Sequence, residues 1–258
     1  MKLMISPAKK MEVKEDFIPW LQLPVFLERT RILMDYIRSL TLEEARTLWG
    51  CNEALASLNY RRFQEMDLEN HLTPAILAYE GIQYQYMAPQ VFDQGSLDYI
   101  QEHLRILSGF YGILRPMDGV APYRLEMQAK THFFADGKEY RELYSFWGER
   151  LCRELTADDP VVINLASKEY SKGIEPFLTS EQTMIHVVFG SLAPDSGGIL
   201  KLKTKATEAK MARGEMVRFL AETRASRPED LKNFCRLNYH FSREMSDETH
   251  YIFLKELS

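Results

Sequence analysis

Cysteine is scarce in this sequence of 258 residues and provides no structural framework. The three cysteines, Cys51, Cys152 and Cys235, are far apart, and no two of them form a C-x-x-C pair. A disulfide framework needs an even set of cysteines, and a zinc knuckle needs closely spaced ones. The cysteine usage therefore argues against both and favours a reducing compartment, which predicts a cytoplasmic protein.

Long apolar stretches are also lacking. No run approaches the roughly 18 residues of a membrane helix, and the first residues show no basic segment followed by a long apolar one. We therefore expect neither export nor a membrane partner. With 45% hydrophobic residues and no linker-like segment, residues 1–258 are expected to form a single domain.

Common catalytic and metal-binding motifs are missing as well. No G-x-S-x-G sequence surrounds any serine, which argues against serine hydrolase chemistry. The six histidines show no E-x-x-H or H-x-x-x-H spacing, which argues against a zinc or di-iron site. No metal and no other cofactor is expected.

What the sequence does contain is three short apolar runs that each end at a serine and at turn-forming or charged residues, within residues 3–9, 105–112 and 161–168. If these runs are parallel strands, their carboxyl ends lie at one edge of one sheet, where open α/β folds bind ligands. Ser6, Ser108 and Ser167 would then form a polar cleft and present hydroxyl groups to a phosphate or a base edge. Alternatively, each serine only forms a turn.

Periodicity predicts an α/β protein with a mixed sheet flanked by helices on both faces. The N-terminal third is expected to be mainly helical, because apolar residues recur at helical spacing over 25–40 and Thr41 with Glu44 forms a capping box. Asn52 and Ser96 are expected to cap helices that run to about residues 65 and 104. Further helices are predicted at 140–155 and 207–223, and further strands at 75–79, 184–189, 199–202 and 250–254.

The G-F-Y-G sequence at residues 109–112 allows two interpretations. It could form a hairpin whose backbone N–H groups face a phosphate, as in helix-hairpin-helix DNA-binding proteins. Alternatively, Gly109 and Gly112 only turn the chain after a buried strand, with Tyr111 in the core.

Positive charge is concentrated in one segment of a chain whose formal net charge is −5. Between residues 201 and 227, eight lysines and arginines accompany three glutamates. Lys210 and Arg213 are three residues apart, so they are neighbours on the helix expected there. The segment could therefore contact a polyanion, although a solvated helix face is the simpler interpretation.

Five motifs together resemble one known family: I-S-P-A-K at 5–9, L-S-G-F-Y-G-I-L-R-P at 107–116, P-Y-R-L-E-M at 122–127, F-W-G at 146–148 and V-I-N-L-A-S at 162–167. In this order they are similar to the YaaA family of bacterial peroxide-stress proteins, also called UPF0246 or DUF328. The resemblance implies a cytoplasmic stress-response protein that limits intracellular free iron and oxidative damage. It also implies a YaaA-type α/β fold with a basic cleft, a helix-hairpin-helix-like element and DNA binding. The family's K-K-A-R-G pattern is kept here at Lys210 and Arg213, while Met211 replaces one lysine.

Three functional hypotheses follow from these residues, and they leave open whether the protein is an enzyme. In the first, the protein binds DNA through phosphate contacts from Lys9, Arg115, Arg124, Lys210 and Arg213. In the second, it is an enzyme that acts on a nucleotide or a nucleic-acid base, with Glu126 as general acid or base in a pocket lined by Ser108, Tyr111, Tyr123, Glu126 and Asn164. A small anionic or nucleotide ligand is the partner in that case.

A third hypothesis is a scaffold whose basic helix docks an acidic partner. A deep pocket holding Glu126 beside the serines would favour chemistry, and a broad basic groove would favour DNA binding.

Overall fold

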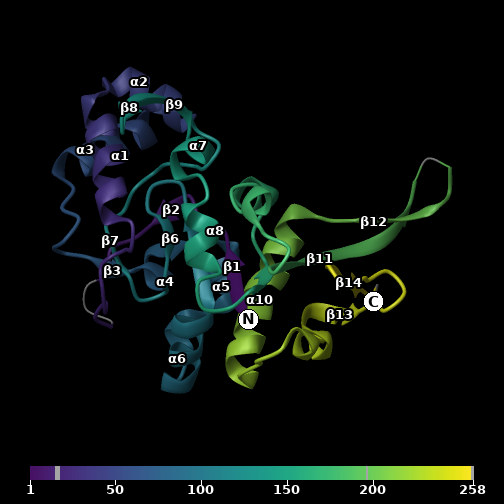
Figure 1. Cartoon of the computed structure of the whole chain (residues 1–258). Helices are drawn as coiled ribbons and strands as arrows, with labels where there is room; N and C mark the ends of the chain where they lie inside the picture. Colours follow the sequence, from purple (N-terminus) through teal and green to yellow (C-terminus); the bar gives the residue numbers. More distant parts are fainter. Residues whose placement is uncertain (15–17, 196, 257–258) are drawn as a thin grey trace.

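The computed structural model describes residues 1–14, 18–195 and 197–256 (Figure 1). Its main feature in these ranges is an eight-stranded mixed sheet, with the order β13-β14-β11-β10-β1-β5-β6 and with β12 paired to β11. The strands are β1 (Lys2–Ile5), β5 (Leu104–Ser108), β6 (Gly112–Leu114), β10 (Val161–Asn164), β11 (Thr183–Pro194), β12 (Leu200–Lys203), β13 (Tyr239–Phe241) and β14 (His250–Lys255). The prediction of a mixed α/β fold is confirmed.

The centre of the sheet is parallel. β1 pairs in parallel with both β10 and β5, and β11 pairs in parallel with β10 and β14. The three serine-ended runs are therefore neighbouring parallel strands, as their pattern predicts. β1 is buried along its whole length, which explains why its sequence is a continuous apolar run and not an alternating one.

The described chain also contains ten α-helices. They are α1 (Leu27–Ser39), α2 (Leu42–Trp49), α3 (Glu53–Glu65), α4 (Ala75–Ala78), α5 (Ile82–Met87), α6 (Gln94–His103), α7 (Leu143–Trp147), α8 (Arg150–Leu155), α9 (Lys168–Ser171) and α10 (Ala206–Thr223), with short 3-10 turns at Pro89–Val91, Glu175–Phe177, Pro228–Asn233 and Arg236–Asn238. Short strand pairs join β2 (Lys10–Met11) to β4 (Tyr79–Glu80), β3 (Thr73–Pro74) to β7 (Gly119–Val120) and β8 (Lys130–Ala135) to β9 (Lys138–Glu142). Within the described ranges, no helix combines the length and the apolar character needed to cross a membrane.

The expected helix starts are partly confirmed. The Thr41 side chain accepts from the Glu44 N–H and the Glu44 carboxylate accepts from the Thr41 N–H, and Asn52 caps α3. The cap of α6 is Asp93 and not Ser96, because the Asp93 side chain accepts a hydrogen bond from the Ser96 N–H. A carboxylate at this position meets the same need as a serine.

Two predicted elements are wrong. Residues 75–78 form the short helix α4 and not a strand, because the N–H groups of Ala75 and Ile76 bond to carbonyls of the loop at 116–118 and not to a sheet. A run of four apolar residues cannot distinguish a buried strand from a buried helix. Residues 140–155 form the end of β9 and two helices, because Gly148 has a φ of +53° and breaks the helix after Trp147.

The close contact between α10 and α5 determines where the basic residues of α10 lie. Gly214 faces α5, and a Cβ atom added there would lie 2.1 Å from the carbonyl oxygen of Gln83 and 2.9 Å from the Met87 nitrogen. Only glycine lets two helix backbones approach so closely. On α10, Ala209, Ala212 and Met216 are buried, as the apolar spacing predicts.

We predict that Gly214→Ala lowers the free energy of unfolding by roughly 1–3 kcal/mol, since the added methyl group would push two backbones apart. The measurement is urea unfolding followed by circular dichroism. Gly95→Ala is the matched control, because Gly95 is also helical but its added Cβ would meet only the flexible end of the Arg224 side chain. Equal effects of the two substitutions would contradict the proposed role of Gly214.

Candidate functional site

Two of the three serines meet at the carboxyl edge of the sheet. The Ser167 N–H donates to Ser6 Oγ at 2.8 Å, and Ser6 Oγ donates to Ser167 Oγ at 3.2 Å. The Tyr84 hydroxyl, from α5, donates to the Ser6 carbonyl at 3.0 Å. These bonds fix the ends of β1 and β10 relative to α5.

Ser108 lies elsewhere, in the core beneath this edge. It is fully buried, and its Oγ lies 2.6 Å from the Tyr123 hydroxyl, which in turn lies 2.7 Å from the Tyr79 hydroxyl. Burial raises the pKa of Tyr123 to about 12, so this network is uncharged at neutral pH. The prediction that Ser108 joins the polar cleft is wrong, because its hydroxyl is used inside the protein.

The G-F-Y-G segment is a tight turn between β5 and β6. The N–H groups of Phe110 and Tyr111 both donate to Ser108 Oγ, and both side chains are buried. These N–H groups therefore cannot face a phosphate, and strands flank the turn on both sides. The helix-hairpin-helix interpretation of Gly109–Gly112 is wrong, and its alternative, a turn with Tyr111 in the core, is confirmed.

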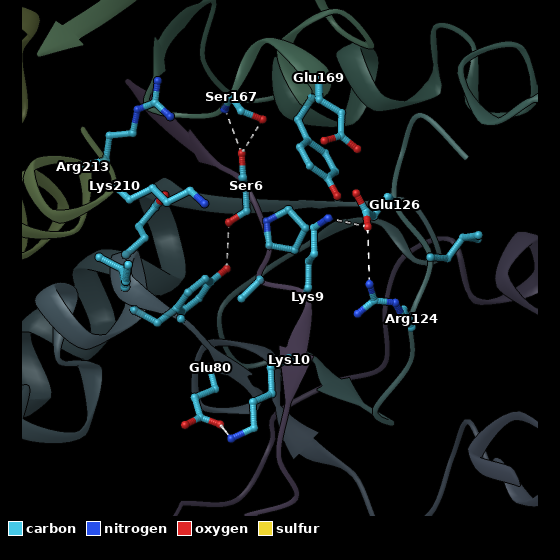
Figure 2. A pocket seen from close by; sticks show the side chains of 18 of the residues that line it. Ser6, Lys9, Lys10, Glu80, Arg124, Glu126, Ser167, Glu169, Lys210 and Arg213 are labelled. Carbon is cyan, nitrogen blue, oxygen red and sulfur yellow. Dashed lines mark hydrogen bonds and ion pairs between the residues drawn. The ribbon is translucent and has the colours of Figure 1, made fainter. Parts of the chain in front are cut away.

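A cavity of about 520 Å³ opens beside Ser6 and Ser167 (Figure 2). Its walls come from the segment after β1, from β4 and α5, from residues 123–126, from α9 and from α10. Among the described residues, five basic and three acidic side chains line it, namely Lys9, Lys10, Arg124, Lys210 and Arg213 with Glu80, Glu126 and Glu169. The geometry thus brings four of the five predicted phosphate-binding residues around one cavity.

Three buried nitrogen donors in the walls of this cavity lack a hydrogen-bond partner. They are Gln83 Nε2, Arg124 Nε and Arg213 Nε. Burial lowers the pKa of Arg213, and within the described ranges the Arg213 side chain makes no ion pair. Buried donors are nearly always satisfied in native proteins, so three unsatisfied ones in the walls of one cavity mark it as the candidate site.

On the side of the cavity opposite Lys210 and Arg213, the carboxylate of Glu126 contacts two cations (Figure 2). Lys9 Nζ lies 2.8 Å and Arg124 Nη2 3.9 Å from the same oxygen, Oε1, of Glu126 (Figure 2). Glu169 lies on the same wall, and burial, followed by the charge of Glu126, raises its pKa. Glu126 and Glu169 are thus two carboxyl groups in different environments within one pocket.

Arg115 is not part of this site. β6 runs antiparallel to β5, so Arg115 follows β6 at the opposite edge of the sheet. There it lies 3.6 Å from Glu154 and lines a separate cavity of about 220 Å³ together with Arg105 and Asp118. The prediction that Arg115 joins the other four basic residues is therefore wrong.

Tyr111 and Asn164 have structural partners and do not line the main cavity. The Tyr111 hydroxyl donates to the Ala121 carbonyl and accepts from the Ala121 N–H. Asn164 Nδ2 lies 2.9 Å from His186 Nδ1, and Asn164 Oδ1 accepts from the Ala166 N–H. Tyr123 and Glu126 do line the cavity, so the predicted pocket residues divide between the core and the site.

Much of the positive charge between 201 and 227 is already neutralised. The ion pairs are Lys201–Asp195, Lys205–Glu208, Arg218–Glu222 and Arg227–Asp230. Lys210 and Arg213 differ from these residues, because they face the cavity (Figure 2). The basic segment is thus no continuous groove but contributes two cations to a pocket.

Several lining residues carried no signal in the sequence. Gln83 and Tyr84 follow Gly81 in α5, and Glu169 and Tyr170 follow Ser167 in α9. Only the second pair could have been found, because it immediately follows a serine-ended strand. As for metals, no group of three or more His, Cys, Asp or Glu side chains in the described chain is placed to hold an ion.

The fold and the cavity define an α/β protein with a basic, donor-rich pocket at the carboxyl edge of parallel strands. Sequence comparison gives its family: residues 1–245 match the family described as "Peroxide stress protein YaaA", and the chain belongs to that family. Similar relatives are UPF0246 proteins of Agathobacter rectalis (48% identical, covering 100% of both chains), of Desulfitobacterium hafniense (49%, 100% of this chain and 99% of the relative) and of Lactiplantibacillus plantarum (50%, 98% and 99%). The resemblance inferred from the five motifs is confirmed.

The separate cavity beside Arg115 gives a prediction about pH. Burial raises the pKa of Asp118 from 3.8 to about 6. Between these two pH values, Asp118 is therefore protonated more readily in the folded chain than in the unfolded chain. The wild-type protein should therefore lose up to about 3 kcal/mol of stability as the pH rises from 4 through 6, relative to Asp118→Asn, which does not titrate. Urea unfolding of both proteins at pH 4 and pH 7.5 measures this difference, and an equal change in both would contradict it.

Proposed function

We propose that this protein acts in the peroxide-stress response by binding nucleic acid, with one nucleotide of the strand held in the main cavity. The observation that supports this is the set of unpartnered donors on Gln83, Arg124 and Arg213 around the cavity. Arginine pairs well with phosphate, because its planar guanidinium group donates to two oxygens at once. Lys210, which lies on α10 together with Arg213, supplies a further positive charge to the cavity.

The size of the cavity favours a nucleotide over an intact duplex. A volume of about 520 Å³ is within the range of small-ligand sites, whereas a DNA duplex is far too wide to enter. The aromatic residues Tyr84, Tyr123 and Tyr170 line the same cavity, as expected for a site that receives a base. DNA would therefore bind through an unpaired nucleotide or one turned out of the stack.

The limitation of intracellular free iron and of oxidative damage is the cellular part of this proposal. In this scheme the protein lowers free iron through its effect on a nucleic acid and not by holding iron itself. The family name supports the link to peroxide.

The test is fluorescence anisotropy of labelled single-stranded and duplex DNA at two or more salt concentrations. Neutralising Lys210 and Arg213 together as methionines should weaken binding. It should also make the plot of log affinity against log salt shallower by roughly 0.7 for each phosphate of a single strand that the variant no longer neutralises. Lys138→Met is the control, since Lys138 is an exposed lysine in β9 outside the cavity. An unchanged salt dependence in a folded double variant would remove both residues from the site.

A second candidate function, an enzyme acting on the bound nucleotide, is favoured by the pair Glu126 and Glu169. Two cations contact Glu126, whereas burial raises the pKa of Glu169, so the two carboxyl groups have the different environments that a base and an acid need. In this scheme the ligand is the same, and the two carboxyl groups act on it.

Glu126→Gln separates the two functions. Removing the carboxylate frees Lys9 and Arg124, so the affinity for an anionic ligand should rise by a few-fold and not fall. If the protein is an enzyme, cells carrying this variant should lose protection from peroxide although binding is retained. If they keep full protection, Glu126 has no catalytic role.

A further inference from the structure

A second cavity lies next to the main one and shares part of its wall. Its volume is about 360 Å³, and three of its lining residues, Lys9, Arg124 and Glu126, also line the main cavity. These three side chains, which we call the divider, therefore stand between two hollows. Any ligand that occupies both must be wide at its ends and narrow at the divider.

The second cavity also has a donor without a partner. It is lined by the end of α2, including Trp49 and Gly50, and by residues 128–130. Trp49 is 4% exposed, and its Nε1–H has no hydrogen-bond acceptor within the described chain. The indole ring stacks on Phe63, with ring centres 5.7 Å apart, so its position is fixed by packing.

Two cations of the divider, Lys9 and Arg124, can bind one more anion. Lys9 is 66% exposed, so its ammonium group can leave Glu126 without disturbing the core. Arg124 is 12% exposed and contacts Glu126 through Nη2, while its buried Nε has no partner. Glu126 can thus remain paired with Arg124 while the exposed ammonium group of Lys9 binds a second acceptor group.

On the basis of the proposed function, we propose that the two cavities bind two consecutive nucleotides of one strand, and that the phosphodiester between them lies over the divider, bound by Lys9 and Arg124. A dinucleotide has the required shape, because two bulky nucleosides are joined by a narrow linkage. That linkage carries one negative charge on two free oxygens, which suits contact with the cationic side chains of Lys9 and Arg124. Arg213 and Lys210 then contact the phosphate at the far end of the nucleotide in the main cavity.

The experiment compares three probes: 5′-phosphorylated thymidine, the 5′-phosphorylated thymidine dinucleotide, and the same dinucleotide with an uncharged methylphosphonate linkage. Dissociation constants are measured by calorimetry with the full chain. The second nucleotide should tighten binding by roughly five- to a hundredfold, as expected for one further bound base. The methylphosphonate dinucleotide should bind more weakly than the phosphodiester, because Lys9 and Arg124 then have no anionic partner.

Two variants test the placement. Lys9→Met should reduce the preference for phosphodiester over methylphosphonate, whereas Lys138→Met should leave that preference unchanged. Gln128→Trp, an exposed position on the wall of the second cavity, should reduce the advantage of the dinucleotide over the mononucleotide.

The outcomes distinguish this inference from the function on which it rests. If mononucleotide and dinucleotide bind equally well, or if both linkages bind equally well, the two-nucleotide site is wrong while nucleotide binding in the main cavity stands. If the single-stranded DNA and all three probes fail to bind, both proposals fall.

Discussion

The contact between α10 and α5 at Gly214 is the constraint on which the site depends. It brings the backbones of two helices together so closely that no side chain fits between them. Because Arg213 precedes Gly214, the same contact holds its guanidinium group at the cavity, against the wall formed by Gln83 and Tyr84. The other wall is fixed by Ser6 and Ser167, which tie the ends of two parallel strands together. The cavity is therefore enclosed by elements that cannot easily move apart.

The polar groups around this cavity lower the stability of the folded protein when no ligand is bound. A buried donor without an acceptor costs free energy, and desolvation disfavours the charged form of Arg213. A bound anion would remove these penalties together. By contrast, four other cations of the segment 201–227 have carboxylate partners within the chain, namely Lys201, Lys205, Arg218 and Arg227. Lys210 and Arg213 line the cavity, so their position indicates the site better than the total charge of the segment does.

Much of the fold could be predicted from the sequence, because β1, β5 and β10 are apolar runs of the length typical of buried parallel strands. The positions of the three serines at the ends of these runs could not be predicted so reliably from the sequence. Ser6 is followed by a loop and Ser167 by helix α9, whereas Ser108 ends a strand that turns back at once, and its hydroxyl caps that turn. The same return carries Arg115 to the far edge of the sheet. Gln83 belongs to no motif, so only the packing of α5 reveals it, whereas Glu169 closely follows a serine-ended strand.

The position of β1 has a consequence for how the protein folds during synthesis. β1 is synthesised before both of its neighbours, β5 and β10, which lie about a hundred and about a hundred and sixty residues further along the chain. This apolar strand must therefore wait unpaired until β5 has been synthesised, and folding that depends on such distant contacts is slow. Gly214 and Arg213 emerge later still. The nascent chain is thus exposed to aggregation or to chaperone binding for longer than the chain of a protein built from local hairpins.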